Sequence, residues 1–164
     1  MKTIVLISCV SRKLPHKAKA SIFRKNIGRA ILSRDHDPFL EQWEFDLTAS
    51  EAKRRYAPSL DFIKQRQVEN QVSEYIRKNL CCVVFQVENK EKRFEWESKI
   101  ISRVSLCTEC GPSPTWLGNY SPKDKIRRSG LWSVNELYKT PITDSDLTVL
   151  KMMCCSKLGK LDAP

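Results

Sequence analysis

The order of apolar and polar residues predicts a chain in which strands and helices alternate. Residues 3–10 (TIVLISCV) form a continuous apolar run rich in β-branched side chains, which is typical of a buried strand. Residues 43–47 (WEFDL) alternate apolar and acidic side chains, which indicates a half-buried strand. Residues 81–87 (CCVVFQV) predict a third strand. Together with the helices below, these strands indicate an α/β-type fold in one small domain.

Apolar residues at helical spacing predict helices over residues 19–34, 60–78 and 92–104. A fourth helix is expected over residues 143–153, because Thr143 can cap it and two aspartates follow in its first turn. The residues between 108 and 128 contain three prolines and are expected to form a long connection.

Positive charge is segregated along the chain. The 29 lysines and arginines outnumber the 19 acidic residues, so the formal net charge is +10. Residues 1–34 contain nine of these cations and no acid, and four more lie close together within residues 123–128. Such segregation is the pattern expected of phosphate contacts, although lysine-rich solvated faces are the alternative. The residues predicted to bind DNA are Lys19, Lys25, Arg29, Lys123, Lys125, Arg127 and Arg128.

Hydropathy and cysteine usage favour a cytoplasmic protein. No apolar run approaches the roughly 18–20 residues that cross a bilayer, so no membrane association is expected. The short apolar run at residues 3–10 superficially resembles a lipoprotein signal, but basic residues follow it at once, which disfavours export. The seven cysteines form an odd, unevenly spaced set, which is not the pattern of a disulfide framework.

Cys107 and Cys110 have the two-residue spacing of a zinc knuckle. A structural zinc ion needs four ligands, and only the adjacent Cys154 and Cys155 could supply the other thiolates. Neighbouring residues rarely both reach one tetrahedral ion, so we expect a loop with two thiols and no zinc. The sequence also lacks a phosphate-cradling glycine loop, which disfavours nucleotide hydrolysis of the P-loop kind.

Two charged residues on predicted helices each have two interpretations. Glu97 is either a surface carboxylate paired with Arg93 one turn earlier or a ligand for Mg²⁺, a cation that takes one or two carboxylates. Arg24 is either a solvated arginine or a bidentate clamp on a phosphate. Spacing alone favours the simpler interpretation of both residues.

Four stretches taken together resemble the GIY-YIG endonuclease superfamily. They are residues 21–32 (SIFRKNIGRAIL), the strand at 81–87, residues 97–101 (ESKII) and residues 114–122 (PTWLGNYSP). The similarity extends from about residue 21 to 138 and includes residues 129–138 (SGLWSVNELY). Each motif is weak by itself, and their order and spacing carry the resemblance.

The resemblance implies a fold, a reaction and roles for two residues. Members of this family have a small antiparallel sheet flanked by helices and cut phosphodiester bonds. An arginine of the first helix holds the scissile phosphate, a helix glutamate binds one divalent metal ion, and tyrosines of two strand motifs help activate water. The arginine corresponds to Arg24 and the metal-binding glutamate to Glu97, and the metal would be Mg²⁺ or Mn²⁺.

The chain also departs from the family pattern. Residues 1–20 contain neither the GIY nor the YIG motif, and the first tyrosine is Tyr56. Residues 1–20 instead resemble the start of a separate domain of unknown function that is found fused to such nucleases. Thr115 lies where a supporting asparagine is expected, and Asn119 is four residues away. Positioned acid–base catalysis is worth about 10²–10⁴-fold, so its loss predicts impaired cleavage.

These observations predict an α+β fold with a small, mostly antiparallel sheet of about three strands flanked by helices. The expected organisation is an N-terminal strand and basic loop (1–20), a GIY-YIG-like domain (21–140), and a C-terminal helix and tail (141–164). The expected function is nucleic-acid binding, with DNA favoured as the partner, and impaired metal-dependent phosphodiester hydrolysis in which Arg24 and Glu97 face one cavity. A non-catalytic DNA-binding or protein-interaction module is the alternative.

Overall fold

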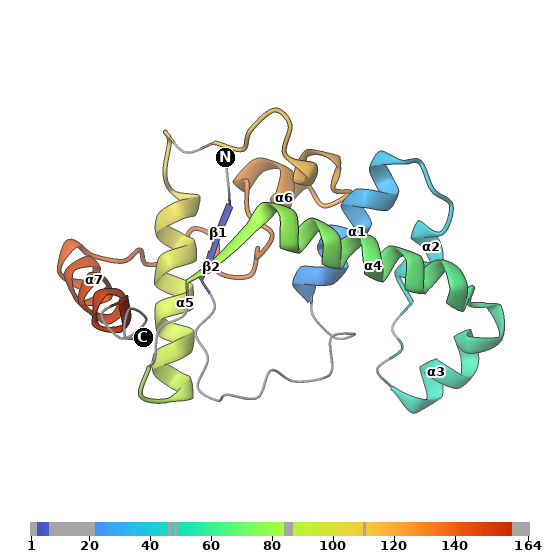
Figure 1. Ribbon diagram of the computed structural model, residues 1–164, viewed down its shortest axis with the longest axis horizontal. Coiled ribbons are helices and arrows are strands. Elements are labelled where there is room, and N and C mark those ends of the chain that lie inside the picture. Colours follow the sequence, from blue (N-terminus) through green and yellow to red (C-terminus); the bar gives the residue numbers. More distant parts are fainter. Residues whose placement is uncertain are drawn as a thin grey trace, which may run out of the picture. The chain divides into compact units, whose positions relative to one another are not determined.

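The residues described by the computed structural model form two compact units, each assembled from segments that are distant in the sequence (Figure 1). The structure describes residues 3–6, 22–45, 47, 49–83, 87–109 and 111–158. We call residues 3–6, 79–83, 87–109 and 135–158 the strand unit, and residues 22–45, 47, 49–78 and 111–134 the helical unit.

The strand unit contains two paired strands and two long helices. Strand β1 (Thr3–Leu6) lies beside and parallel to β2 (Leu80–Val83), with Thr3 opposite Leu80 (Figure 1). Helix α5 (Lys90–Ser105) begins at Asn89, whose side chain accepts a hydrogen bond from the Lys92 amide. Its C-terminal half is tied to the segment before helix α7 (Asp144–Leu158), because the Ile142 amide donates to the Lys99 carbonyl at 3.2 Å.

The predicted α+β fold with a mostly antiparallel sheet of about three strands is wrong. The described residues are mostly helical, and the one pairing among them joins two short parallel strands. The strand predicted at 43–47 is not formed by its described residues, because Trp43 ends helix α2 (Leu40–Trp43) and Glu44 lies in a turn, while Asp46 lies outside the described part. The other two predicted strands are present only as Thr3–Leu6 and Leu80–Val83, and residues 7–10 and 84–86 lie outside the described part.

The helical unit contains most of the remaining elements. Helices α1 (Ile22–Arg34), α2, α3 (Ser50–Tyr56) and α4 (Phe62–Asn79) follow one another, with the short helix η2 (Ala57–Ser59) before α4. The predicted long connection also contains two short helices, which are η3 (Leu117–Tyr120) and α6 (Asp124–Ser129). Asp124 begins α6 two residues after Pro122, and Gly130 ends it with a left-handed backbone at φ 69°.

The core of the helical unit lies where α1, α4 and the two short helices meet. Its fully buried side chains include Ile27, Val68, Val72 and Ile126. Asn26 is also completely buried, and its side-chain amide donates to the Trp132 carbonyl at 2.9 Å. This bond satisfies a polar group inside the core and fixes α1 against the segment that follows α6.

Trp43 explains why residues 43–47 do not form a strand. Its indole nitrogen donates to the Lys25 carbonyl at 3.0 Å, and the ring is 8% exposed. The ring lies against Gly28, where an added Cβ would be 2.3 Å from the indole. The apolar alternation therefore reflects the packing of α2 on α1 and not the period of a sheet.

Helical periodicity and capping gave correct predictions elsewhere. Helices α4 and α5 match their predicted ranges within two residues at each end, and α7 begins as predicted but continues five residues beyond residue 153. Helix α1 matches its predicted range from residue 22 to its end, and residues 19–21 lie outside the described part. Thr143 caps α7 as predicted, because its hydroxyl accepts from the Asp146 amide at 3.2 Å while the Asp146 carboxylate accepts from the Thr143 amide at 3.0 Å. No helix in the described ranges is long and apolar enough to cross a membrane.

Candidate nucleic-acid interface

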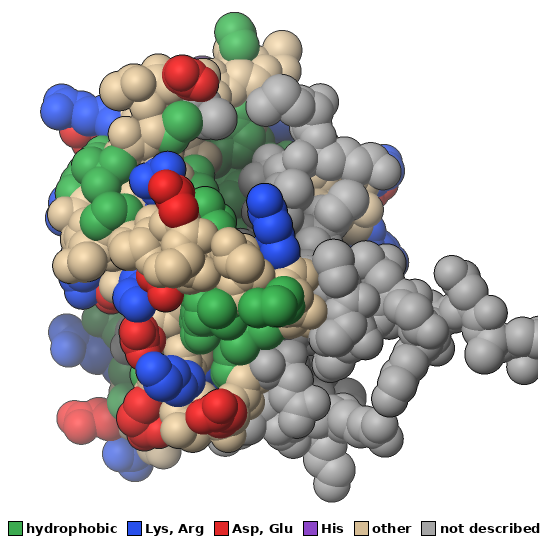
Figure 2. All heavy atoms as spheres, turned by 90° about the vertical axis from the view of Figure 1, so that its left-hand side faces the viewer, with side chains coloured by type: hydrophobic (Ala, Val, Ile, Leu, Met, Phe, Trp, Pro, Cys, Tyr) green, Lys and Arg blue, Asp and Glu red, His purple; other side chains and the backbone are tan. Residues whose placement is uncertain are grey.

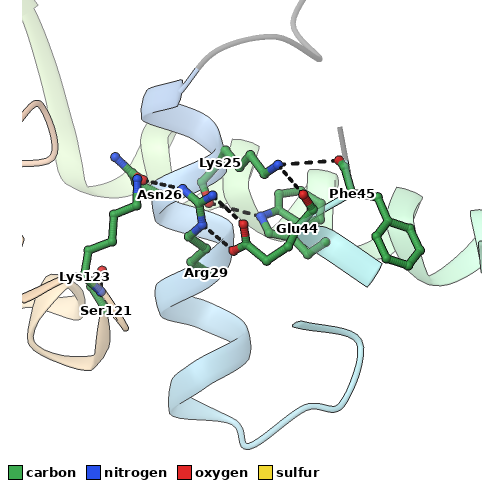
Figure 3. Close-up of polar contacts among 8 residues, drawn as sticks. Lys25, Asn26, Arg29, Glu44, Phe45, Ser121 and Lys123 are labelled. Carbon is green, nitrogen blue, oxygen red and sulfur yellow. Dashed lines mark hydrogen bonds and ion pairs between the residues drawn. The ribbon is translucent and has the colours of Figure 1, made fainter. Parts of the chain in front are cut away.

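Three of the predicted DNA-binding residues gather around one carboxylate in the helical unit. Lys25 and Arg29 project from α1, and Lys123 precedes α6 (Figure 3). The carboxylate belongs to Glu44, directly after α2. We call Lys25, Arg29 and Lys123 the basic cluster. Sequence distance concealed this arrangement, because Lys123 is almost one hundred residues from α1.

Within the basic cluster, Arg29 is the residue whose side chain is bonded to two other side chains, those of Glu44 and Asn26. Its Nε and Nη2 atoms both donate to the Glu44 carboxylate, with the Nη2–Oε2 distance at 2.5 Å. Its Nη1 atom donates to the side-chain oxygen of the buried Asn26 at 2.7 Å. The guanidinium side chain is 11% exposed, whereas that of Glu44 is 44% exposed. The pair is therefore open to solvent mainly on the side of Glu44.

Lys25 binds main-chain oxygens next to the same carboxylate. Its ammonium group donates to the Glu44 carbonyl at 2.9 Å and to the Phe45 carbonyl at 3.5 Å (Figure 3). These carbonyls follow the last turn of α2, where a cation complements the unpaired backbone oxygens. Lys25 therefore stabilises the turn that presents Glu44 to Arg29.

Lys123 experiences the positive charge of the other two cations. Burial lowers the pKa of its ammonium group, nearby Arg29 and Lys25 lower it further, and Glu44 acts in the opposite direction. In Figure 3 the Lys123 side chain extends toward Asn26 on α1. A lysine whose charged form is disfavoured in the folded protein marks a place where an added anion would be stabilising.

Helix α6 adds three cations that differ in their exposure and in their bonds to neighbouring groups. Lys125 is exposed. Arg128 pairs with Asp124 at 2.8 Å, but its side chain is 78% exposed, so this pair contributes little stability. Arg127 also contacts Asp124, at 3.1 Å, and donates to the Ser121 carbonyl at 2.5 Å. Lys125 and Arg128 are thus the most accessible members, and Lys19 lies outside the described residues.

Arg24 is held by α4. Its Nη2 atom lies 2.7 Å from the Glu69 carboxylate, 3.1 Å from the Glu69 carbonyl and 2.9 Å from the Ser73 hydroxyl. The side chains of Arg24 and Glu69 are 19% and 25% exposed. The arginine predicted as a phosphate clamp therefore has a structural partner in this conformation.

Glu97 lies on α5 in the strand unit with an exposed side chain. The pair with Arg93 considered above is not among the described ion pairs, and the Arg93 guanidinium instead lies over the Phe94 ring at 4.8 Å. Arg24 and Glu97 belong to different units, and their common cavity stays a prediction. No described group of three or more histidine, cysteine or acidic residues could hold a metal ion.

Charges in the strand unit are mixed in sign, and several of them are paired. Lys99 binds Glu95 at 2.8 Å and Asp146 at 3.5 Å, and Lys92 binds Glu95 at 3.0 Å. In the face drawn in Figure 2, basic and acidic side chains are interspersed among apolar ones over the described surface. These ion pairs of the strand unit contrast with the basic cluster of the helical unit, where three cations accompany the one carboxylate of Glu44.

Thr115 and Asn119, which were considered for the supporting asparagine of the family pattern, both make local contacts. The Thr115 hydroxyl lies 3.1 Å from the Ser113 hydroxyl. The Asn119 amide group donates to the Ser113 and Pro114 carbonyls, each at 3.0 Å, and so braces the turn before η3. The structure thus gives Asn119 a local role in the helical unit.

Comparison with protein families gives a decisive result. A family model described as the GIY-YIG domain matches residues 15–157, which is most of the chain. The protein belongs to the GIY-YIG domain family. The resemblance inferred from the sequence motifs is therefore confirmed, and it extends beyond residues 21–138 on both sides. No curated protein and no solved structure matched the chain.

Membership of the GIY-YIG family indicates a nuclease-type function related to nucleic acid. GIY-YIG nucleases generally depend on a divalent metal ion. The donor chemistry of Glu97 fits such an ion, because Mg²⁺ is commonly held by one or two carboxylates and completes its shell with water and phosphate.

Proposed function

We propose that this GIY-YIG domain binds the phosphate backbone of DNA through the cations of α1 and α6, and that its capacity for phosphodiester hydrolysis is impaired. The observation that carries the proposal is that Lys25, Arg29 and Lys123 lie close enough for the charges of the first two to lower the pKa of the third, with only Glu44 acting in the opposite direction. Phosphate contacts of this kind are independent of sequence, so the domain would bind many DNA sequences with similar affinity.

The accessible cations extend this surface. Counting the basic cluster with Lys125, Arg127 and Arg128, six cations accompany the two carboxylates of Glu44 and Asp124. These six cations exceed the two carboxylates by four positive charges, which favours a polyanion over a neutral partner. Lys123, Lys125 and Arg128 are the proposed direct contacts, because Lys125 and Arg128 are exposed and the positive charge of Lys123 is disfavoured in the absence of an anion.

Impaired hydrolysis is supported by the state of the two catalytic candidates. Arg24 would have to leave Glu69 and Ser73 to clamp a phosphate, and that exchange costs part of the binding energy. Glu97 would hold the metal ion, which when bound supplies Lewis-acid stabilisation of the phosphate charge. The tyrosines of the GIY and YIG motifs are absent from residues 1–20, so this chain lacks the family's aid to water activation there.

The competing possibility is a non-catalytic module that binds an acidic protein through the same cations. It shares the electrostatic argument but predicts no preference for a phosphate backbone over a carboxylate-rich chain. Parallel titrations with duplex DNA and polyglutamate separate the two. DNA is expected to bind more tightly, because arginine and lysine contacts to regularly spaced phosphates release condensed counterions.

The first test of the proposal compares two lysine variants in DNA binding. Lys123→Gln should weaken binding to a labelled duplex about fivefold at 0.15 M salt, the effect of losing one phosphate contact. Lys151→Gln is the matched control, because Lys151 is exposed on α7 and has the same charge, and it should change affinity less than twofold. Equal effects of the two substitutions would contradict the proposed surface.

The second test concerns hydrolysis. With Mg²⁺ or Mn²⁺, the protein should cut DNA far more slowly than a GIY-YIG nuclease that retains both tyrosine motifs, and Glu97→Ala should abolish the remaining cleavage. Glu95→Ala is the control on the same helix, since Glu95 is already paired with Lys92 and Lys99. Fast cleavage that survives Glu97→Ala would refute the assigned role of Glu97.

A further inference from the structure

Glu44 occupies a position that the proposed DNA-binding function leaves unexplained. It is an acidic residue in the middle of the basic cluster, and the Arg29 pair holds the pKa of its carboxyl below the usual value, with further lowering from Lys25 and Lys123. The carboxylate is therefore charged at neutral pH and reduces the attraction of this surface for a polyanion. A site built only for phosphate would gain affinity from a neutral residue here.

The geometry of the pair is that of an arginine bound to an oxyanion. Arg29 presents Nε and Nη2 side by side to the two oxygens of Glu44, which is the bidentate fork used for both carboxylates and phosphates. The third nitrogen is fixed by Asn26, and Asn26 is itself anchored to the Trp132 carbonyl. The guanidinium is thus oriented by the core, and its fork would keep this orientation if Glu44 moved away.

Glu44 is the more exposed partner of the pair. Its side chain is 44% exposed, against 11% for Arg29, and it belongs to the turn after a helix of four residues. The Glu44 carboxylate can turn further into solvent without leaving a charged acid buried in the protein. The same rotation would leave the Arg29 fork, with Lys25 and Lys123 beside it, open to another oxyanion.

We propose that Glu44 is an intramolecular substitute for a backbone phosphate, which a DNA phosphate displaces from Arg29 when the domain binds. The inference rests on the proposed function. Arg29 then contacts a phosphate only in the complex, and Glu44 lowers the affinity of the domain for DNA. Displacement exchanges one charge-assisted pair for another, so the carboxylate lowers affinity without preventing binding.

The test removes the charge of Glu44 and keeps its shape. Glu44→Gln should bind a labelled DNA duplex about fivefold more tightly than the unmodified chain at 0.15 M salt, because no carboxylate has to be displaced from Arg29. The log–log salt dependence should change little, because Arg29 contacts a phosphate in both complexes. Glu41→Gln is the matched control on α2, with the same charge change at an exposed residue. Its effect should stay below twofold because water and salt screen it.

A second measurement uses the unmodified chain and does not depend on the folding of a variant. The Arg29 Nε–H resonance should shift on saturation with DNA, since its acceptor changes from a carboxylate to a phosphate. An unchanged resonance in the saturated complex would overturn the inference, as would an affinity of Glu44→Gln no greater than that of Glu41→Gln. If neither the unmodified chain nor these variants bind DNA, the proposed function fails as well.

Discussion

Gly28 shows how a single residue positions the basic cluster. It lies in α1 between Lys25 and Arg29, at the point where the indole of Trp43 packs on the helix. Glycine is unfavourable in a helix interior by roughly 1 kcal/mol relative to alanine, so helix propensity alone does not account for it here. The close contact with Trp43 does, because it brings α2 near enough for Glu44 to reach Arg29.

Gly28→Ala is therefore expected to destabilise the protein in spite of its better helix propensity. The added methyl group would have to displace a buried aromatic ring from 2.3 Å, and overpacking of this kind costs about 1–3 kcal/mol. Gly111→Ala is the control, because no atom lies within 4 Å of the added group. Chemical denaturation measures both changes, and a Gly28→Ala variant as stable as Gly111→Ala would contradict the described packing of α2.

At the scale of elements, the contact between α1 and α4 gives Arg24 a structural role. One guanidinium nitrogen satisfies two oxygens of Glu69 and the hydroxyl of Ser73, one turn further along α4. This contact is partly buried, so it is less screened by water than the exposed pairs on α6. It joins the first helix of the chain's described part to the longest one.

A double-mutant cycle measures this contact. Arg24→Ala and Glu69→Ala should show a coupling free energy of about 1–2 kcal/mol, since hydrogen bonds to charged groups in partly buried sites have this magnitude. The Arg128–Asp124 pair, with side chains 78% and 52% exposed, is the control and should couple by less than about 0.5 kcal/mol. Absence of coupling between Arg24 and Glu69 would leave Arg24 available as a phosphate clamp.

The four long helices could be predicted from sequence because their signals are local. Apolar spacing marks α1 and α4, and the Thr143–Asp146 pair marks the start of α7. The predicted strand at 43–47 failed because its alternating pattern is shared by a short helix and turn whose apolar side chains reach a neighbouring helix. Trp43 is buried by α1, a contact that no local pattern contains.

The individual cations of the candidate site could be predicted from the sequence, but their arrangement could not. Charge segregation identified Lys25, Arg29 and Lys123 as separate groups of cations, and the family resemblance singled out Arg24 and Glu97. Their partners could not be predicted, because Glu44 meets Arg29 through the packing of α2, and Glu69 meets Arg24 through α4. The sequence shows which residues are acidic, but which cation each of them pairs with depends on tertiary structure.

For the whole molecule, the net charge is +10, and the cations of α1 and α6 that we propose as phosphate contacts belong to the helical unit. The domain boundaries at residues 20 and 140 stay a prediction, whereas the family match covers residues 15–157. The basic cluster lies within this matched range, and so do all three cations of α6. Binding should therefore depend on the family domain and on ionic strength.

The most direct test is the salt dependence of DNA affinity for the unmodified chain. With about four phosphate contacts, from Arg29, Lys123, Lys125 and Arg128, the logarithm of the association constant should fall against the logarithm of salt concentration with a slope of about −4. Lys123→Gln should reduce the magnitude of this slope by about 0.9. An affinity that does not change with salt, or a slope unaffected by Lys123→Gln, would contradict the account.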